Sequence, residues 1–201
     1  MSPVRRPRLA VALFAFVALL SGCSSAPEPE LRVGPSVSVP ERSEESVTST
    51  APEERAVPAE VAVSSLGIAS SLMELGLNTD GTVEVPPAEK GMTAGWYTGG
   101  VVPGEVGAAV IIGHNDTRFG KAVFHDLKKI TKGADITVTD ASGDAAHFTV
   151  TDTESVGKNA FPTEKVYGPT QDRALRLITC DGDFDAQGHP VNNLIVYATL
   201  S

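Results

Sequence analysis

The sequence predicts a mostly β fold, either a sandwich or a barrel, for residues 61–201. Short apolar or alternating runs recur between Gly and Pro turn signals, which is typical of a chain with many short strands. Helical periodicity is weak and is confined to Ile68–Leu75 and a turn or two around Val123–Lys129. About 140 residues are available for this part, which is enough for one compact core.

Five segments are expected to form strands. The first follows the turn signal Pro103-Gly104, and the third alternates so that Phe148 and Val150 share one face. In chain order, the expected strands are Val106–Ile112, Asp135–Thr139, Ala146–Glu154, Leu175–Thr179 and Leu194–Thr199.

Residues 1–22 have the pattern of a signal peptide. Three arginines, at positions 5, 6 and 8, precede the twelve-residue apolar run Leu9–Leu20, whereas a membrane-spanning helix needs about 20 residues. The run ends in Leu20-Ser21-Gly22-Cys23, which resembles the lipobox of bacterial lipoproteins. We therefore expect lipidation of Cys23 and a lipid anchor on the extracytoplasmic face of the cell membrane. The alternative is an ordinary secretory signal with a coincidental cysteine.

Residues 23–60 are expected to be a lipid-anchored, disordered tether. After Cys23 the stretch contains eight Glu, six Pro and seven Ser, with no aromatic residue. Such a composition buries too little apolar surface to offset the loss of chain entropy. The alternative is a loop packed on the domain. The expected organisation is a signal peptide over 1–22, the tether over 23–60 and one domain over 61–201.

Charge and cysteine content exclude several classes of protein. The net charge of −9 and the pI near 4.9 argue against nucleic-acid binding, which needs clustered Lys and Arg. Two cysteines cannot support a disulfide-rich scaffold or a multi-cysteine zinc site. Once Cys23 is lipidated, Cys180 is the only thiol of the exported chain, and a lone free thiol there suggests a reactive role.

Cys180 and His114 both stand where an apolar strand gives way to a polar loop. A histidine within reach of a cysteine can take and return its proton during acyl transfer. The alternatives are a buried cysteine acting as a small hydrophobe and a surface histidine in a turn. We interpret the other histidines as structural: His125, His147 and His189.

The order of the two residues separates cysteine-enzyme families. Papain-like endopeptidases place the cysteine first, at a helix N-terminus. L,D-transpeptidases carry Ser-x-Gly before their cysteine, whereas Leu177-Ile178-Thr179 precedes Cys180 here. Neither family fits.

Leu177-Ile178-Thr179-Cys180 closely resembles the Leu-x-Thr-Cys signature of sortases, and the stretch looks most like class F, an actinobacterial type. The similarity covers roughly residues 62–199. It is carried also by Trp96-Tyr97-Thr98-Gly99-Gly100, Pro103-Gly104, Gly113-His114-Asn115-Asp116, Ala122-Val123-Phe124, Phe161-Pro162-Thr163 and Val166-Tyr167-Gly168.

The resemblance implies an eight-stranded sortase β-barrel with short helices. It implies Cys180 as nucleophile and His114 as general acid/base, with no metal or organic cofactor. The implied reaction is cleavage of a Leu-Pro-x-Thr-Gly-like sorting signal on secreted proteins through a thioester. An amine of the cell wall, such as a peptidoglycan cross-bridge, then accepts the acyl group.

The sequence departs from the sortase pattern after the cysteine. The family normally carries an Arg there, yet residues 181–201 contain neither Arg nor Lys, and Val191 is expected near its position. Removing one oxyanion donor can cost about 2.7–4 kcal/mol. Arg176, on the same strand face as Cys180, and Arg118 are candidate replacements. The alternative function is therefore a catalytically impaired sortase-like lipoprotein that binds sorting signals or partners.

The sequence departs from the sortase pattern in two further places, one directly after Cys180 and one at the N-terminus. Asp181-Gly182-Asp183-Phe184-Asp185 stands where class F tends to have Gly-Gly. The lipobox replaces the transmembrane anchor that the family more often uses.

Overall fold

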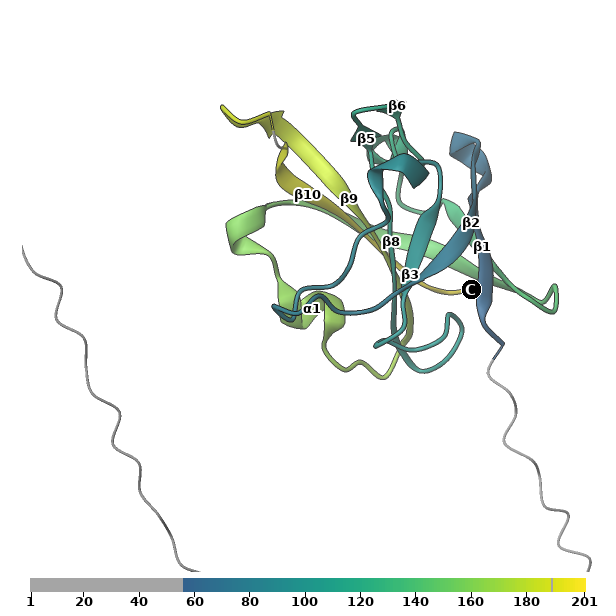
Figure 1. Cartoon of the computed structure of the whole chain (residues 1–201). Coiled ribbons are helices and arrows are strands. Elements are labelled where there is room, and N and C mark those ends of the chain that lie inside the picture. The colour runs from purple at the N-terminus through teal and green to yellow at the C-terminus, as the bar shows by residue number, and fades with distance from the viewer. Residues whose placement is uncertain (1–55, 189) are drawn as a thin grey trace, which may run out of the picture. The chain divides into compact units, whose positions relative to one another are not determined.

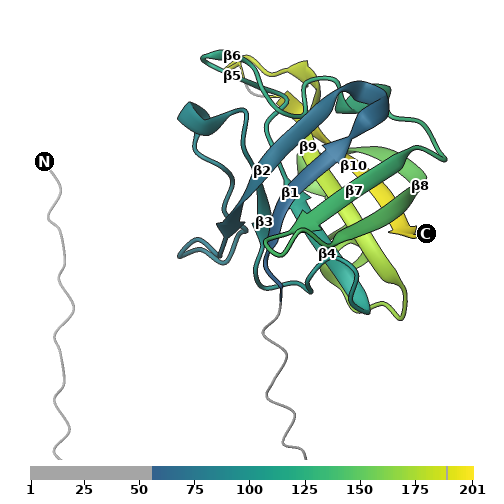
Figure 2. The same ribbon diagram turned by 90° about the vertical axis from the view of Figure 1, so that its right-hand side faces the viewer.

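The computed structural model describes residues 56–188 and 190–201, and eight of its strands close into a barrel. Going round the barrel, the strand order is β1-β2-β3-β4-β9-β10-β8-β7 (Figure 1). Figure 2 shows β2, β1 and β7 side by side across the near wall. The strands are β1 Pro58–Val63, β2 Ile68–Leu75, β3 Ala94–Tyr97, β4 Gly107–Ile112, β7 Asp135–Asp140, β8 Ala145–Gly157, β9 Arg173–Phe184 and β10 Pro190–Leu200.

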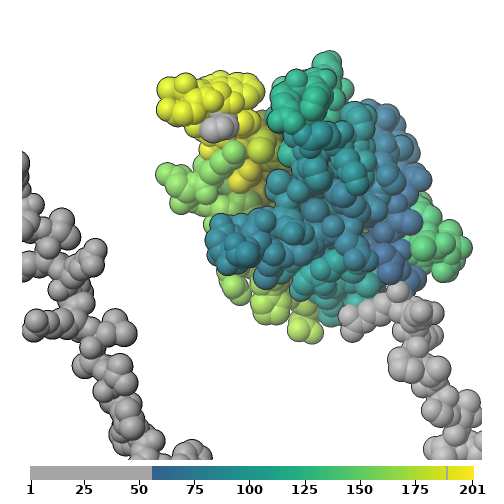
Figure 3. All heavy atoms as spheres, viewed as in Figure 1, coloured from purple at the N-terminus to yellow at the C-terminus, as the bar shows by residue number. Residues whose placement is uncertain are grey.

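Short elements complete the fold. A separate hairpin, β5–β6, projects from the same end of the barrel as the tip of β9–β10 (Figure 3). The short elements are β5 Asp116–Thr117, β6 Gly120–Lys121, the 3₁₀ turns η1 Ser64–Leu66, η2 Ala88–Lys90, η3 Leu127–Lys129 and η4 Lys158–Ala160, and the helix α1 Thr163–Tyr167. This architecture confirms the predicted mostly β fold.

Two apolar clusters lie on opposite faces of the same strands. On β9, Leu175 and Leu177 belong to the larger cluster together with Phe124 and Phe148, all fully buried. Ile178 belongs to a smaller cluster that includes Val166 of α1. Because side chains alternate along a strand, the larger cluster fills the barrel. The smaller one covers the outer face of β4, β9 and β10.

The segment Ile68–Leu75, expected to be helical, is instead strand β2. It pairs antiparallel with β1 and parallel with β3. Its Ser70 hydroxyl is buried, where it accepts the Ala94 N–H at 2.9 Å and has the carbonyl oxygens of Ser71 at 2.7 Å and Met92 at 3.2 Å as acceptors for its proton. Pairing on both edges thus outweighs a weak helical pattern. The region around Val123–Lys129 contains only turns and η3.

The five expected strands are present, and three are longer by several residues than the sequence pattern indicated. β8, β9 and β10 continue into polar residues that carry no apolar signal. His147 lies within β8. β1 begins at Pro58, so the barrel includes the last residues expected in the tether.

The signal peptide, Cys23 and the tether up to residue 55 lie outside the described residues, as does His189. No helix among the described residues is long and apolar enough to cross a membrane.

Candidate active site

The register of β4 and β9 brings His114 and Cys180 together. These strands are parallel, with Ile112 opposite Ile178, and the Gly113 N–H extends the ladder by donating to the Ile178 carbonyl at 3.0 Å. His114 and Cys180 each follow that last pair by two residues, so both lie at the same end of adjacent strands. Neighbouring strands are only about 4.8 Å apart. The pair expected from the sequence therefore forms one site.

The His114 ring is held by a loop that precedes β3. Its Nε2 lies 2.6 Å from the carbonyl oxygen of the buried Pro86. A carbonyl only accepts, so Nε2 carries a proton in this contact and the neutral ring keeps Nδ1 as its acceptor. The backbone is fixed as well, because the Phe124 N–H donates to the His114 carbonyl at 2.9 Å.

Gly113 is required by close packing just before the histidine. A Cβ at this position would lie 2.6 Å from Cδ2 of Phe124 and 2.8 Å from Cγ1 of Val123. Real Cβ atoms do not approach other atoms so closely, so any larger residue would displace the strand end that presents His114.

Cys180 is a free, half-buried thiol. The preceding Thr179 is only 4% exposed, and its Oγ1 has no hydrogen-bond partner among the described residues. The following Asp181 turns toward β8, where its carboxylate accepts the Ser155 hydroxyl at 2.7 Å. The thiol is thus flanked by an unpaired hydroxyl and by a carboxylate that is bonded elsewhere.

Cys180 and His114 line a groove of about 790 Å³ on the outer face of the barrel. Ile112 and Ile178 contribute apolar surface at its base, and the rings of Tyr97 and Tyr167 meet edge to face with centroids 5.8 Å apart. Burial raises the pKa of Tyr167 to about 12, which reflects the poor hydration of this wall. The remaining lining residues are Leu77, Gly81, Thr82, Val83, Val85, Pro86, Gly113, Lys158, Phe161, Thr163, Thr179 and Asn193.

A second, smaller hollow of about 110 Å³ also reaches Cys180. Its lining is largely polar and comes from the loop after β4, from η3 and from the ends of β9 and β10. The residues are Asn115, Asp116, Phe124, His125, Lys128, Thr179, Asp181, Gly182, Phe184 and Leu194. Cys180 and Thr179 are common to both cavities.

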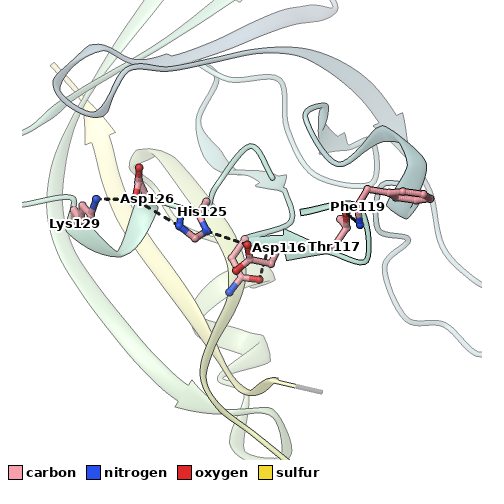
Figure 4. A network of polar contacts seen from close by, with 7 residues as sticks. Asp116, Thr117, Phe119, His125, Asp126 and Lys129 are labelled. Carbon is pink, nitrogen blue, oxygen red and sulfur yellow. Dashed lines mark hydrogen bonds and ion pairs between the residues drawn. The ribbon is translucent and has the colours of Figure 1, made fainter. Parts of the chain in front are cut away.

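His125 lines this hollow and is part of a polar network with Asp116 and Asp126 (Figure 4). Its Nδ1 lies 3.0 Å from Oδ1 of Asp116, and its Nε2 lies 4.0 Å from Asp126. Lys129 Nζ is 2.7 Å from Oδ1 of Asp126, and this hydrogen bond lowers the pKa of the Asp126 carboxyl. The ring is therefore fixed by carboxylates, in keeping with a structural role.

Neither candidate arginine lines the groove. Arg176 shares the outer face with Cys180, but its guanidinium donates to the carbonyls of Leu175 at 3.1 Å and Ala198 at 3.5 Å. It also lies over the Tyr197 ring, 4.9 Å from its centroid, and burial lowers the pKa of its guanidinium. Because a strand rises about 3.3 Å per residue, Arg176 starts about 13 Å from Cys180 along β9.

Arg118 is engaged at the β5–β6 hairpin. It forms an ion pair with Glu89 and lies over the Phe119 ring, 4.8 Å from its centroid. Among the described residues that line the groove, Lys158 is the one Lys or Arg. Within residues 56–188 and 190–201, no arginine thus lines either cavity at the thiol.

The residue across from Cys180 on β10 is Asn193, and Val191, which is expected near the position of the family's Arg, precedes it by two residues. The ladder has an irregularity between Pro190 and Asn192, and Val191 is 41% exposed beside it. An irregularity in a hairpin leaves no clear trace in the sequence. Counting residues from Cys180 could therefore not identify its cross-strand neighbour.

The pattern of the sortase domain family matches residues 61–201. The chain is a member of the sortase family. Listeria monocytogenes sortase A is 25% identical, with a TM-score of 0.55 and coverage of 73% of this chain and 88% of that one. A lid mutant of Corynebacterium diphtheriae sortase A is 20% identical, with a TM-score of 0.57 and coverage of 75% and 73%.

A Clostridium perfringens sortase D5 transpeptidase is also similar, at 20% identity and a TM-score of 0.53, with coverage of 72% of this chain and 79% of that one. No curated protein sequence gives a significant match. The eight-stranded barrel is thus a sortase fold, and membership of the family supports a cysteine transpeptidase activity.

Proposed function

We propose that this sortase is a class F transpeptidase that cleaves a Leu-Pro-x-Thr-Gly-like sorting signal through Cys180 and transfers it to an amine of the cell wall. The observation that carries the proposal is the β4–β9 register, because it puts a histidine and a free thiol side by side at one groove. A nucleophile needs a base within hydrogen-bond reach, either directly or after substrate closes the site.

In the proposed first half-reaction, the Cys180 thiolate attacks the carbonyl carbon of the signal threonine. The bond from that carbon to the glycine nitrogen breaks, and the imidazolium of His114 gives its proton to the leaving amine. A thioester on Sγ remains. In the second half-reaction an acceptor amine attacks the thioester, His114 takes the proton and the thiolate leaves.

The groove suits the apolar part of such a signal. Leucine and proline side chains gain stability by leaving water, at roughly 25 cal/mol per Å² of buried apolar surface. The groove presents Tyr97, Tyr167 and Phe161 together with the two isoleucines at its base. The smaller polar hollow, which shares Thr179 and Cys180 with the groove, offers a hydrophilic acceptor a separate route to the thiol.

The proposal includes location and partners. Lipid on Cys23 would hold the barrel outside the membrane, near secreted proteins that bear C-terminal sorting signals and near peptidoglycan amines. Metabolic labelling with an alkyne-bearing palmitate tests the anchor. Label is expected on the wild-type chain and absent from Cys23→Ser, and equal labelling of both would refute lipidation at Cys23.

The activity is tested with a Leu-Pro-x-Thr-Gly peptide and a short oligoglycine acceptor, with products followed by mass spectrometry. The wild-type chain is expected to form the ligated peptide, and Cys180→Ala to form none. Peptides with Ala in place of Leu or Pro should react more slowly, because they lose apolar contact with the groove.

The alternative is a sortase-like protein that binds sorting signals without turnover. One observation favours it, since no arginine reaches the groove among the described residues. Saturable binding of the peptide without ligation or cleavage, across several signal variants, would support this alternative and contradict the first proposal.

A further inference from the structure

We propose that the carboxamide of Asn193 is the hydrogen-bond donor that stabilises the oxyanion at Cys180, in place of an arginine. The inference rests on the proposed transpeptidase function. It assigns a catalytic contact to a side chain that sequence reasoning passed over.

Strand geometry places Asn193 next to the thiol. Asn193 and Cys180 are directly opposite on the antiparallel pair β10–β9. Directly opposite residues project to the same face, with Cβ atoms about 4.5–5.5 Å apart. Both residues line the groove, which agrees with that geometry.

The flanking positions are complementary. β9 lies between β4 and β10 in the barrel. Cys180 therefore has His114 on one side and Asn193 on the other. A carbonyl carbon bonded to Sγ can then present its leaving nitrogen toward the histidine and its oxygen toward the carboxamide.

The Asn193 carboxamide is available for this role. It is half-buried and makes no hydrogen bond to any other described residue. By contrast, Arg176 and Arg118 have partners away from the thiol. Its N–H groups can therefore donate to a ligand oxygen without breaking a hydrogen bond to the described part of the chain.

Stabilising the oxyanion requires hydrogen-bond donors, and these need not carry a positive charge. A side-chain amide presents two N–H groups, and a fixed amide donor in an oxyanion hole typically accounts for about 10²–10³-fold in kcat. The donor acts when the carbonyl oxygen gains negative charge, so its removal should lower kcat much more than it raises KM.

The test compares neighbouring asparagines. Asn193→Leu keeps the approximate size of the side chain and removes the donors, and Asn193→Arg restores N–H donors. Asn192→Leu is the matched control, since Asn192 Nδ2 contacts the Ser155 hydroxyl at 3.5 Å and does not line the groove. With the full chain, Asn193→Leu is expected to lower kcat by about 10²–10³-fold. Asn192→Leu should stay within about threefold, and Asn193→Arg should recover most of the loss.

A second measurement does not depend on turnover. A Leu-Pro-Ala-Thr peptide aldehyde adds to the Cys180 thiol as a hemithioacetal. A C–S bond forms, the C=O double bond becomes a C–O single bond, and the proton of the thiol passes to that oxygen, which faces the donor. Asn193→Leu is expected to weaken aldehyde binding at least tenfold. It should leave the affinity of the matching peptide alcohol, which cannot form the adduct, unchanged.

The outcomes separate the two claims. If wild type ligates peptides and Asn193→Leu matches it in kcat and aldehyde affinity, the assignment of Asn193 is wrong and the transpeptidase remains. If Asn193→Leu is active and Asn193→Arg is not, Asn193 has a packing role and the assignment also fails. If wild type does not ligate peptides, the assignment of Asn193 stands only if Asn193→Leu binds the aldehyde at least tenfold more weakly than wild type, and it fails if the two affinities are equal. If wild type binds no aldehyde, both proposals fall.

Discussion

The two cavities that meet at Cys180 differ in size and in chemistry. The groove is about 790 Å³, and aromatic and aliphatic side chains on the outer barrel face contribute much of its lining. The hollow is about 110 Å³ and includes two carboxylates, an imidazole and a lysine. One thiol thus faces a large, mainly apolar surface and a small polar one.

The difference between the two cavities separates peptide binding, which depends on the groove, from the reaction at the thiol. Apolar burial in the groove can bind an extended peptide segment, whereas the polar hollow is too small to bind one and too hydrophilic to favour it. The reactive atom lies where the two meet, so each side can be altered separately. Matched residue types on the two sides make that comparison direct.

The largest expected difference is between two histidines. His114→Ala should lower kcat/KM for peptide ligation by about 10²–10⁴-fold, because the proton of the leaving amine loses its donor. His125→Ala, which removes the contact of its Nδ1 with Asp116 in the lining of the hollow, should change it by less than about threefold. Steady-state rates with a fluorogenic signal peptide measure both. Equal losses in the two variants would contradict the assignment of separate roles.

A pair of phenylalanines tests the groove as the peptide site. Phe161 lines the groove and packs near Tyr167, with ring centroids 6.1 Å apart, and Phe184 lines the hollow with 62% exposure. Phe161→Ala should raise KM for the signal peptide about tenfold, which corresponds to about 1.4 kcal/mol of lost apolar contact.

Phe184→Ala is the control and should leave that KM unchanged. Thermal melts of both variants exclude unfolding as the cause. A larger increase in KM from Phe184→Ala than from Phe161→Ala would place the peptide site in the hollow and contradict its assignment to the groove.

A smaller effect, on stability, is expected from substituting Thr179, which lines both cavities. Its buried Oγ1 has no partner among the described residues, and an unpaired buried hydroxyl costs free energy that an isosteric methyl does not. Thr179→Val should therefore raise Tm by about 2–4 °C, equivalent to about 1 kcal/mol. Differential scanning calorimetry checks this. A clear fall in Tm would show that the hydroxyl has a stabilising partner.

The smallest effect is the ionisation of Tyr167 in the groove wall. Burial raises the pKa of Tyr167 to about 12, above its usual value of 10.0. The folded state therefore holds the phenol proton more tightly than the unfolded state does. Its contribution to stability is complete below pH 10 and is lost as the pH rises toward 12. Ultraviolet difference titration of wild type and Tyr167→Phe isolates this step, and a midpoint near 10 would mean that the wall is hydrated.

The apolar strands were predictable because alternation or continuous apolar runs mark them, as in Val106–Ile112. Strand β2 was not, because Ile68–Leu75 mixes serines with apolar residues and is fixed by its two neighbours. Cys180 and His114 could be found from residue type, position at strand ends and the family signature. Asn193 could not, because its place opposite the thiol depends on an irregular hairpin register.

The central claim is that Cys180 forms a thioester with a sorting signal. Intact mass spectrometry of the chain, mixed with excess Leu-Pro-x-Thr-Gly peptide and no acceptor and quenched in acid, tests it most directly. The account predicts an added mass equal to the Leu-Pro-x-Thr acyl group, absent in Cys180→Ala and discharged by hydroxylamine. Absence of this adduct from the wild-type chain, while the peptide binds the groove, would contradict the account.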